Sequence, residues 1–460
     1  MALAVTPMML TALACIHYSG GTLPEDRGDL YESLTTWLAR SREKREGRVD
    51  YKECLLRLRA LAYGMTTWPG GRLKQADSET AARILCDSGR LSCRDAALNF
   101  LAEEEMDSGI IVKRGPGGGA VEFSHLTYQE YLAALELDRA KFQPEKEKAL
   151  RSPQRFSLEW REFLRLFAII LDRDAKQGGW LYETLLKAPV DGSLADQART
   201  VALVRTLAAE RRDEESKIGA DYVALVREME GLFEGRADGQ GLELWARGEA
   251  AEAWELLVGD TSRLRLPSDE EYWEAILRRR GAGKKALGRC PVTVFEYAEY
   301  LRLCPGMEPP EYWDYQQRFP LRPVVGVSFY EAEAYCSWCG ELCGRSIRLP
   351  DEQEWERAAA GRYAWGNDKP THDHANYGYE VKHPTPVGLF PKGSPPGKKI
   401  MDLAGNVWEW TSSDYDKDKK YKVRRGGCFY YDERLLRAAI RLRYPAGSRS
   451  FNLGFRCVRE

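Results

Sequence analysis

The spacing of apolar residues changes near residue 265, and this change constrains the fold more than any other feature of the chain. Before it, apolar side chains recur at helical spacing, as at Leu30, Leu34, Trp37 and Leu38, which predicts amphipathic helices. After it, glycine and proline separate short β-branched and aromatic runs that are typical of strands. We therefore expect a multidomain protein with a mostly α-helical N-terminal half and an α+β domain at the C-terminus. The 460 residues suit several domains, and we place these at 1–136, 137–262 and 263–460.

A hairpin within the helical half predicts a winged-helix-like region. Gly109 to Phe123 contains two β-branched runs joined by a Gly/Pro-rich turn. Thr127 and Glu130 follow it with the spacing of a capping box, and Asp29 is placed to cap an earlier helix. Helices followed by a hairpin are the order of elements in a winged helix.

Two helices are expected among the strand-like runs of the C-terminal part. Ser328 with Glu331, and Asp351 with Glu354, each have the capping-box spacing that marks the start of a helix. The strand-like runs around these helices are Pro323–Val327, Thr385–Phe390, Val423–Phe429 and Leu453–Val458.

Charge and cysteine content exclude several classes of protein. Lys+Arg 68 against Asp+Glu 70 leave a net charge of −2, so no overall field favours nucleic acid or anionic lipid. No apolar run reaches the roughly 20 residues of a membrane span. Eleven cysteines, an odd number, indicate reduced thiols in the cytoplasm. Met1–Cys15 is similar to a lipoprotein signal but lacks a positive charge and contains Pro7, so we expect a buried first helix instead.

Three cysteines have a spacing that invites a metal or redox interpretation. Cys336, Cys339 and Cys343 form C-x-x-C-x-x-x-C inside a predicted helix. Structural zinc needs a fourth ligand, and a redox pair favours an exposed helix N-terminus. We expect these thiols to act as small apolar side chains in the core.

Ordered motifs across 285–460 carry a resemblance to a known family. They are Pro291-Val-Thr293, Pro323-Val-Val-Gly-Val-Ser328, Arg348-Leu-Pro350, Glu354-Trp355, Trp365-Gly366, Pro386-Val-Gly388, Asp402-Leu-Ala-Gly-Asn-Val-Trp-Glu-Trp410, Arg425-Gly-Gly427 and Gly454-Phe-Arg-Cys457. This part closely resembles the formylglycine-generating enzymes, or sulfatase-modifying factors. The resemblance implies a C-type-lectin-like fold.

The first half resembles the segment that follows the nucleotide-binding core of STAND NTPases of the NACHT kind. The matching residues are Met9-Leu-Thr-Ala-Leu13, Leu23-Pro24, Asp29-Leu-Tyr31 and Phe123-Ser-His-Leu-Thr-Tyr-Gln-Glu-Tyr131. The phosphate-binding loop itself is missing: the nearest candidate, Gly281–Lys285, has Arg278 where the first glycine belongs. Either the chain is a truncated relative, or a separate NTPase or a defence or signalling protein is its partner.

The chemistry of the resembled enzymes depends on residues that this chain replaces. Family enzymes bind copper with a pair of cysteines, and soft thiolates suit Cu(I). Counted back from Gly454, the two positions are Glu433 and Ala438, which cannot supply thiolates. A second family chemistry uses histidine-bound non-haem iron, for which His372 and His374 form the best cluster. A metal-dependent oxidoreductase with non-standard ligands, including Cys428, stays the alternative to a non-catalytic protein.

The resemblance also implies structural calcium in a loop that matches Asp402 to Glu409. Asp402 and Glu409 offer carboxylates, and Gly405 and Val407 offer backbone carbonyls, which are the hard oxygen ligands that Ca²⁺ prefers. The scaffold loop without a metal is the alternative. Asn376 matches a second site of the family, but no clear acidic partner follows it, so we expect one calcium.

The segment 428–453 interleaves aromatic and arginine side chains, the types that dominate binding hot spots. Diversity-generating retroelements vary this segment in proteins of such folds, which makes a variable protein a further possibility. The alternative is that Leu435, Leu436 and Ile440 belong to the core. The ligand-binding residues that we predict are Phe429, Tyr430, Tyr431, Asp432, Arg434, Arg443, Tyr444, Arg449 and Phe451.

These observations favour a non-catalytic recognition protein. The C-terminal domain would bind a protein ligand on a calcium-stabilised frame, and the helical region would connect it to signalling partners in bacterial or phage defence. DNA binding by the winged helix is a third hypothesis, which the neutral charge of the chain disfavours.

Overall fold

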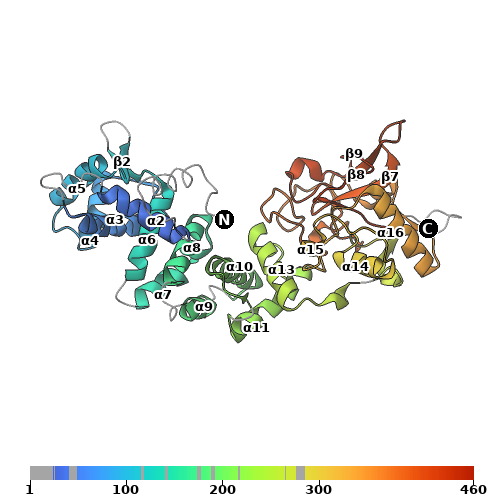
Figure 1. Cartoon of the computed structure of the whole chain (residues 1–460), viewed down its shortest axis with the longest axis horizontal. Helices are drawn as coiled ribbons and strands as arrows, with labels where there is room; N and C mark the ends of the chain where they lie inside the picture. The colour runs from blue at the N-terminus through green and yellow to red at the C-terminus, as the bar shows by residue number, and fades with distance from the viewer. Residues whose placement is uncertain are drawn as a thin grey trace. The chain divides into compact units, whose positions relative to one another are not determined.

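The computed structural model divides the chain into two compact units. The first contains residues 1–190 and 206–218, and the second contains residues 191–205 and 219–460 (Figure 1). The structure describes residues 24, 26–40, 49–114, 119–139, 143–172, 178–187, 192–215, 218–264, 266–275 and 285–460. The predicted first helix at Met1–Cys15, the matches before residue 24 and most of Gly281–Lys285 lie outside the described residues.

The first unit is built from helices and one small sheet. Its helices are α2 (Arg27–Arg40), α3 (Tyr51–Thr66), α4 (Ser78–Asp87), α5 (Arg94–Asp107), α6 (Leu126–Arg139), α7 (Gln143–Arg151), α8 (Leu158–Asp172) and α9 (Gly178–Leu186), and α10 (Leu194–Arg211) contributes to both units. Strands β2 (Ile111–Arg114) and β3 (Ala120–Phe123) form an antiparallel hairpin, with β1 (Gln75–Asp77) on the outer side of β3. The predicted winged-helix hairpin is confirmed.

Two predicted helix caps in this unit are wrong. Asp26, not Asp29, accepts the backbone N–H of the first turn of α2, at 2.8 Å. Thr127 lies inside α6, and Glu130 instead forms a buried ion pair with Arg72 at 2.8 Å. The spacing of a capping box is met here by chance, because the helix starts one residue earlier.

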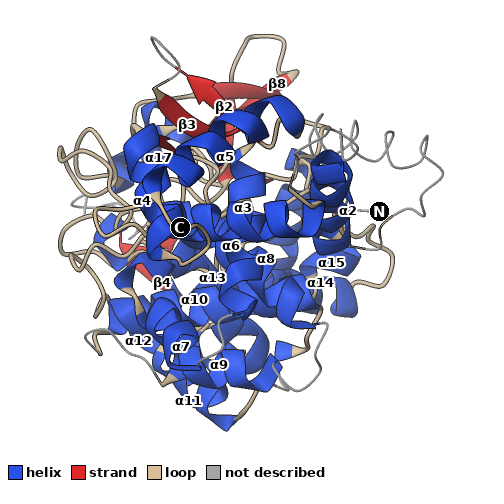
Figure 2. Ribbon diagram, turned by 90° about the vertical axis from the view of Figure 1, so that its left-hand side faces the viewer, coloured by secondary structure: helices blue, strands red, loops and turns tan. Residues whose placement is uncertain are grey.

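The second unit combines helices with two four-stranded sheets. The helices are α11 (Ala220–Glu228), α12 (Glu230–Phe233), α13 (Leu244–Leu257), α14 (Val294–Leu303), α15 (Trp313–Gln316), α16 (Phe329–Cys343) and α17 (Glu352–Ala358). One sheet has the order β10-β7-β8-β9 and the other β4-β5-β11-β6. The strands are β4 (Trp273–Ala275), β5 (Ala286–Gly288), β6 (Ile347–Arg348), β7 (Trp408–Asp414), β8 (Tyr421–Arg425), β9 (Leu442–Pro445), β10 (Leu453–Gly454) and β11 (Val458–Arg459). Figure 2 shows how short the strands are beside the helices and loops.

The helix starts predicted in this unit are confirmed. Ser328 and Asp351 each cap their helix through a complete capping box with Glu331 and Glu354. The strand predictions succeed only in part: β8, β10 and β11 fall near Val423–Phe429 and Leu453–Val458. The runs Pro323–Val327 and Thr385–Phe390 are irregular, apart from a single bridge at Pro323.

Helix α13 packs as part of the C-terminal unit, whereas the sequence placed it in the separate region 137–262. Arg247, completely buried, binds Asp238 at 3.1 Å and Asp373 at 2.8 Å. Glu255 accepts the backbone N–H of Leu321 at 2.8 Å. Because Asp373 and Leu321 are more than 60 residues from their partners in α13, no local pattern could predict these contacts.

Candidate ligand-binding pocket

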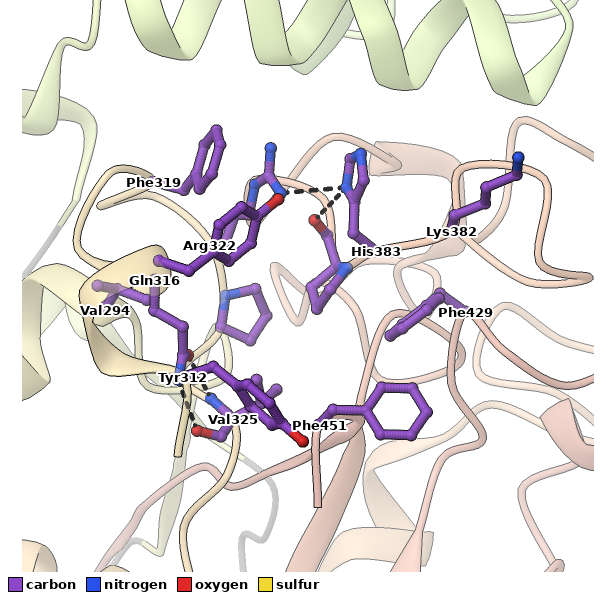
Figure 3. Close-up of a pocket in the computed structure, with 13 residues that line it drawn as sticks. Val294, Tyr312, Gln316, Phe319, Arg322, Val325, Lys382, His383, Phe429 and Phe451 are labelled. Carbon is purple, nitrogen blue, oxygen red and sulfur yellow. Dashed lines mark hydrogen bonds between the residues drawn. The ribbon is translucent and has the colours of Figure 1, made fainter. Parts of the chain in front are cut away.

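A pocket of about 480 Å³ opens in the second unit (Figure 3). Its walls come from the α14–α16 region, from the loop around His383 and from the C-terminal segment. The lining residues are Val294, Tyr312, Tyr315, Gln316, Phe319, Arg322, Pro323, Val325, Lys382, His383, Pro384, Phe429 and Phe451. This volume lies within the range of small-molecule and side-chain binding pockets.

Five of the thirteen residues that line the pocket are phenylalanine or tyrosine. Phe319 and Phe429 are buried in its wall, whereas Tyr312, Tyr315 and Phe451 are 61%, 50% and 44% exposed. In Figure 3, Phe429 and Phe451 stand on one side and Phe319 on the other. Large exposed apolar side chains that gather at one place on a protein commonly mark a binding site.

The aromatic surface continues beyond the pocket. The ring of Tyr430 lies 5.7 Å from that of Phe451, and the ring of Tyr379 lies 4.9 Å from that of Tyr430. Tyr379 and Tyr430 are each nearly half exposed. We call the exposed aromatic residues Tyr312, Tyr315, Tyr379, Tyr430 and Phe451 the aromatic rim.

The backbone at the rim adopts conformations that side chains rarely permit. Tyr312, Tyr379 and Lys382 have φ angles of 60°, 63° and 70°, in the left-handed region that favours glycine. A bulky residue held there costs of the order of 1 kcal/mol, and such strain concentrates at functional sites. The fold therefore holds the backbone of two rim residues, and of Lys382 in the pocket lining, at some energetic expense.

A charged network backs the pocket where it meets α13. Arg322 donates to Glu255 at 3.2 Å and also binds Glu252, and its guanidinium lies 3.7 Å from the centre of the Phe319 ring. His383 contacts Glu252 at 3.1 Å and Arg322 at 3.1 Å. Burial opposes the ionisation of Glu252, but the His383 hydrogen bond and the nearby arginines outweigh it, so the pKa of Glu252 lies below its ordinary value.

The amide of Gln316 is fully used inside the pocket wall. Its oxygen accepts from the N–H of Val325 at 3.0 Å, and its nitrogen donates to the carbonyls of Val325 and Glu311 at 3.0 and 2.7 Å. The polar side chains of the inner wall are thus engaged with the protein itself.

The structure separates the predicted ligand-binding residues into two groups. Phe429 and Phe451 line the pocket and Tyr430 belongs to the rim. The others do not line it. Tyr431 and Tyr444 pack toward the core tryptophans Trp408 and Trp410, and Arg443 lies over the ring of Tyr421. Asp432 pairs with the exposed Arg434, and Arg449 pairs with Glu331. Spacing alone could not separate the two groups, because apart from Arg443 and Tyr444 in β9 these residues lie in loops, turns and one short 3-10 helix.

Sequence reasoning missed the other side of the pocket. Tyr312, Tyr315 and Phe319 precede a predicted strand and were not singled out, and Arg322 and His383 are 61 residues apart. The aromatic cluster in Tyr312-Trp-Asp-Tyr315 was the signal that could have indicated it.

The loop predicted to bind calcium is held by other contacts. Both carboxylate oxygens of Glu409 accept from Arg456 at 2.7 Å, and one also accepts from the Trp355 indole at 2.8 Å. Asp402 accepts from the N–H of Gly388 at 2.7 Å, and burial raises its pKa to about 6. Glu409 does not fit as a metal ligand, because a buried arginine already neutralises it. Calcium bound by Asp402 with the carbonyls of Gly405 and Val407 stays a prediction.

Of the three cysteines in the C-x-x-C-x-x-x-C motif, two are buried as expected and Cys343 is only partly buried. Cys336 and Cys339 belong to the core, and the Cys336 sulfur lies 3.6 Å from that of Cys457. Burial raises the pKa of Cys339, and that of Cys428 to about 11, which disfavours the thiolate. Across the described ranges, no group of three or more His, Cys, Asp or Glu side chains is arranged to hold a metal ion.

His372 and His374 lie in a loop but face different partners. His374 stacks on the Trp365 ring at 4.5 Å, whereas His372 lies 3.4 Å from Glu380. Burial lowers the pKa of His374.

No helix among the described residues is long and apolar enough to cross a bilayer.

Comparison with known families places two domains in the chain. Residues 285–460 match the sulfatase-modifying factor enzyme 1-like domain, and residues 51–137 match the winged helix-turn-helix domain C-terminal to NACHT. Both resemblances seen in the sequence are therefore confirmed, and the chain is a multidomain protein with these two domains.

Among the relatives of this chain, some are named as enzymes and others as inactive members of an enzyme family. Hercynine oxygenase of Mycobacterium tuberculosis is 31% identical over 209 residues, covering 34% of this chain and 48% of that protein. Inactive C-alpha-formylglycine-generating enzyme 2 of Bos taurus is 37% identical over 159 residues, covering 30% of this chain and 50% of that protein. The chain thus spans about half or less of the length of these relatives.

Two solved structures also resemble part of the chain. PvdO from Pseudomonas aeruginosa has a TM-score of 0.34 and 24% identity, covering 39% of this chain and 81% of that one. Treponema denticola variable protein 1 has a TM-score of 0.31 and 21% identity, covering 38% and 84%.

Proposed function

We propose that this protein is a non-catalytic recognition module that binds a protein partner through the aromatic pocket and its rim. The observation that carries the proposal is the continuity between the pocket and the exposed rings of Tyr379, Tyr430 and Phe451. Tyrosine and phenylalanine contribute large contact area with few rotatable bonds, and they are enriched at protein interfaces.

Two observations support recognition rather than the family's oxidation chemistry. The positions expected to hold the copper-binding cysteines carry Glu433, which is exposed, and Ala438. A relative with 37% identity is described as an inactive formylglycine-generating enzyme. The hercynine oxygenase relatives favour the alternative, a metal-dependent oxidoreductase with non-standard ligands, so the experiment must also measure bound metal.

We further propose that the helical half connects this binding to a partner that supplies nucleotide chemistry. The match of 51–137 to a domain that follows NACHT in other proteins supports a separate NTPase, or a defence or signalling protein, acting in the cytoplasm. Structural calcium would stabilise the loop of the C-terminal domain that contains Asp402.

The test is affinity capture from a native lysate with three forms of the full chain. The wild type and the double variant Tyr430→Ala, Phe451→Ala are compared with Tyr330→Ala, which removes a 60% exposed tyrosine that does not line the pocket. A protein retained by the wild type and Tyr330→Ala, but lost by the double variant, supports the proposal.

Elemental analysis of the same samples measures bound copper and iron, which the alternative of a metal-dependent oxidoreductase requires. Copper or iron near one atom per chain, or a partner retained equally by all three forms, would overturn recognition through the pocket. Circular dichroism of each variant checks that the fold is intact.

A further inference from the structure

The pocket interior offers little to a polar ligand. Gln316 is hydrogen-bonded to backbone groups at both ends of its amide, and Arg322 and His383 are engaged with Glu252 and Glu255. A sugar or nucleotide base placed there would give up hydrogen bonds to water, at a cost of about 1–3 kcal/mol for each group that finds no replacement. An apolar side chain gives up none, so the interior selects apolar groups.

The mouth of the pocket has one charge that remains available. Of the charged residues that line it, Arg322 is balanced by two carboxylates, whereas Lys382 is exposed and forms no ion pair within the described part of the chain. The backbone at Lys382 is left-handed, with a φ of 70°. In Figure 3 the Lys382 chain extends above Phe429, on the same side of the pocket.

We propose that the partner enters as a peptide segment in which an apolar side chain, aromatic or long aliphatic, is followed closely by a carboxylate. The apolar side chain fills the space between Phe319 and the Phe429–Phe451 pair, and the carboxylate pairs with Lys382. This inference rests on the proposed recognition function and specifies its ligand.

The aromatic rim argues for a peptide over a free small molecule. Tyr379 and Tyr430 lie outside the pocket lining, yet they continue its surface with rings in contact. A ligand confined to about 480 Å³ would leave these rings uncovered, whereas a peptide chain running out of the pocket covers them.

The experiment selects peptides from a random library displayed on phage, with the full chain immobilised. The baits are the wild type, Lys382→Glu, the rim variant Tyr430→Ala, Phe451→Ala, and Lys420→Glu, which reverses an exposed charge that does not line the pocket. The wild type and Lys420→Glu should enrich peptides with an apolar side chain and an acidic residue within two positions of it. A synthetic peptide of the selected sequence should bind Lys382→Glu at least about fivefold more weakly, and the loss should shrink at high salt.

The outcomes separate the ligand inference from the function on which it rests. Apolar peptides without acidic neighbours, or equal binding by Lys382→Glu, overturn the ligand chemistry and leave recognition standing. Peptides that bind the rim variant as well as the wild type overturn both. A preference for a chain-terminal carboxylate over Asp or Glu identifies the source of the acidic group and supports the inference.

Discussion

Glu409→Gln tests the contact that replaces the predicted calcium ligand. The substitution preserves the shape of the side chain but removes its charge, so Arg456, which is completely buried, loses its counter-charge. In the wild type, the N–H groups of Arg456 and Trp355 both donate to the carboxylate. The NH₂ group of the new amide is itself a donor, so it faces the N–H groups of either Arg456 or Trp355 without an acceptor.

The size of the effect follows from burial. The Arg456 and Glu409 side chains are 0% and 1% exposed, and removing one member of such a pair costs about 3–5 kcal/mol. Hydrogen bonds from Arg456 to the carbonyls of Gly288, Arg289 and Met401 hold the guanidinium in place, so it cannot move to water. For a unit of this size, the loss corresponds to a fall in Tm of about 6–20 °C.

Differential scanning calorimetry with and without calcium measures this effect. Because the chain has two units, the transition of the first serves as an internal reference, and the exposed Glu433→Gln should change stability by less than about 0.5 kcal/mol. A loss below about 1 kcal/mol would refute the ion-pair reasoning. A wild-type calcium stabilisation that vanishes in Glu409→Gln would show that the carboxylate binds the metal after all.

Two further predictions concern buried charge. Burial raises the pKa of Glu296 to about 7 from its ordinary value near 4.5. Between these two pH values the folded state therefore holds a proton that the unfolded state releases. The free energy of unfolding should fall by about 3 kcal/mol as pH rises from 4.5 to 7. Denaturant titrations should show this fall in the wild type but not in Glu296→Gln, and equal pH profiles would contradict it. Arg322→Gln leaves Glu252 and Glu255 without their shared arginine and should cost about 3 kcal/mol by urea unfolding, whereas the exposed Arg434→Gln should be neutral; equal losses would count against the network.

Local sequence signals predicted local structure well where they were complete. The capping boxes at Ser328 and Asp351 and the hairpin at Gly109–Phe123 were predicted correctly, because each depends on groups only a few residues apart. Thr127 failed because the same spacing occurs inside a helix. Trp37 continues an apolar stripe in the sequence but is half exposed.

At the candidate site, local sequence signals identified the aromatic segment but not which of its side chains line the pocket. An aromatic-rich C-terminal segment was evident from the sequence, and Phe429, Tyr430 and Phe451 do lie at the pocket. Tyr431 and Tyr444 have the same character but pack inward. Tyr431 lies outside the helices and strands, where no period fixes which side chains face the solvent, and Tyr444 lies in β9, a strand of only four residues.

The sequence by itself determined the two domain types, the change from helical to α+β architecture and the absence of cysteine at positions 433 and 438, since all three depend on residue identity and order. Only the tertiary structure decided which aromatics share a pocket, that α13 belongs to the C-terminal unit, and that Arg456 neutralises Glu409. These outcomes depend on contacts between residues far apart in the chain, where burial and charge pairing are set by the packed three-dimensional arrangement rather than by spacing.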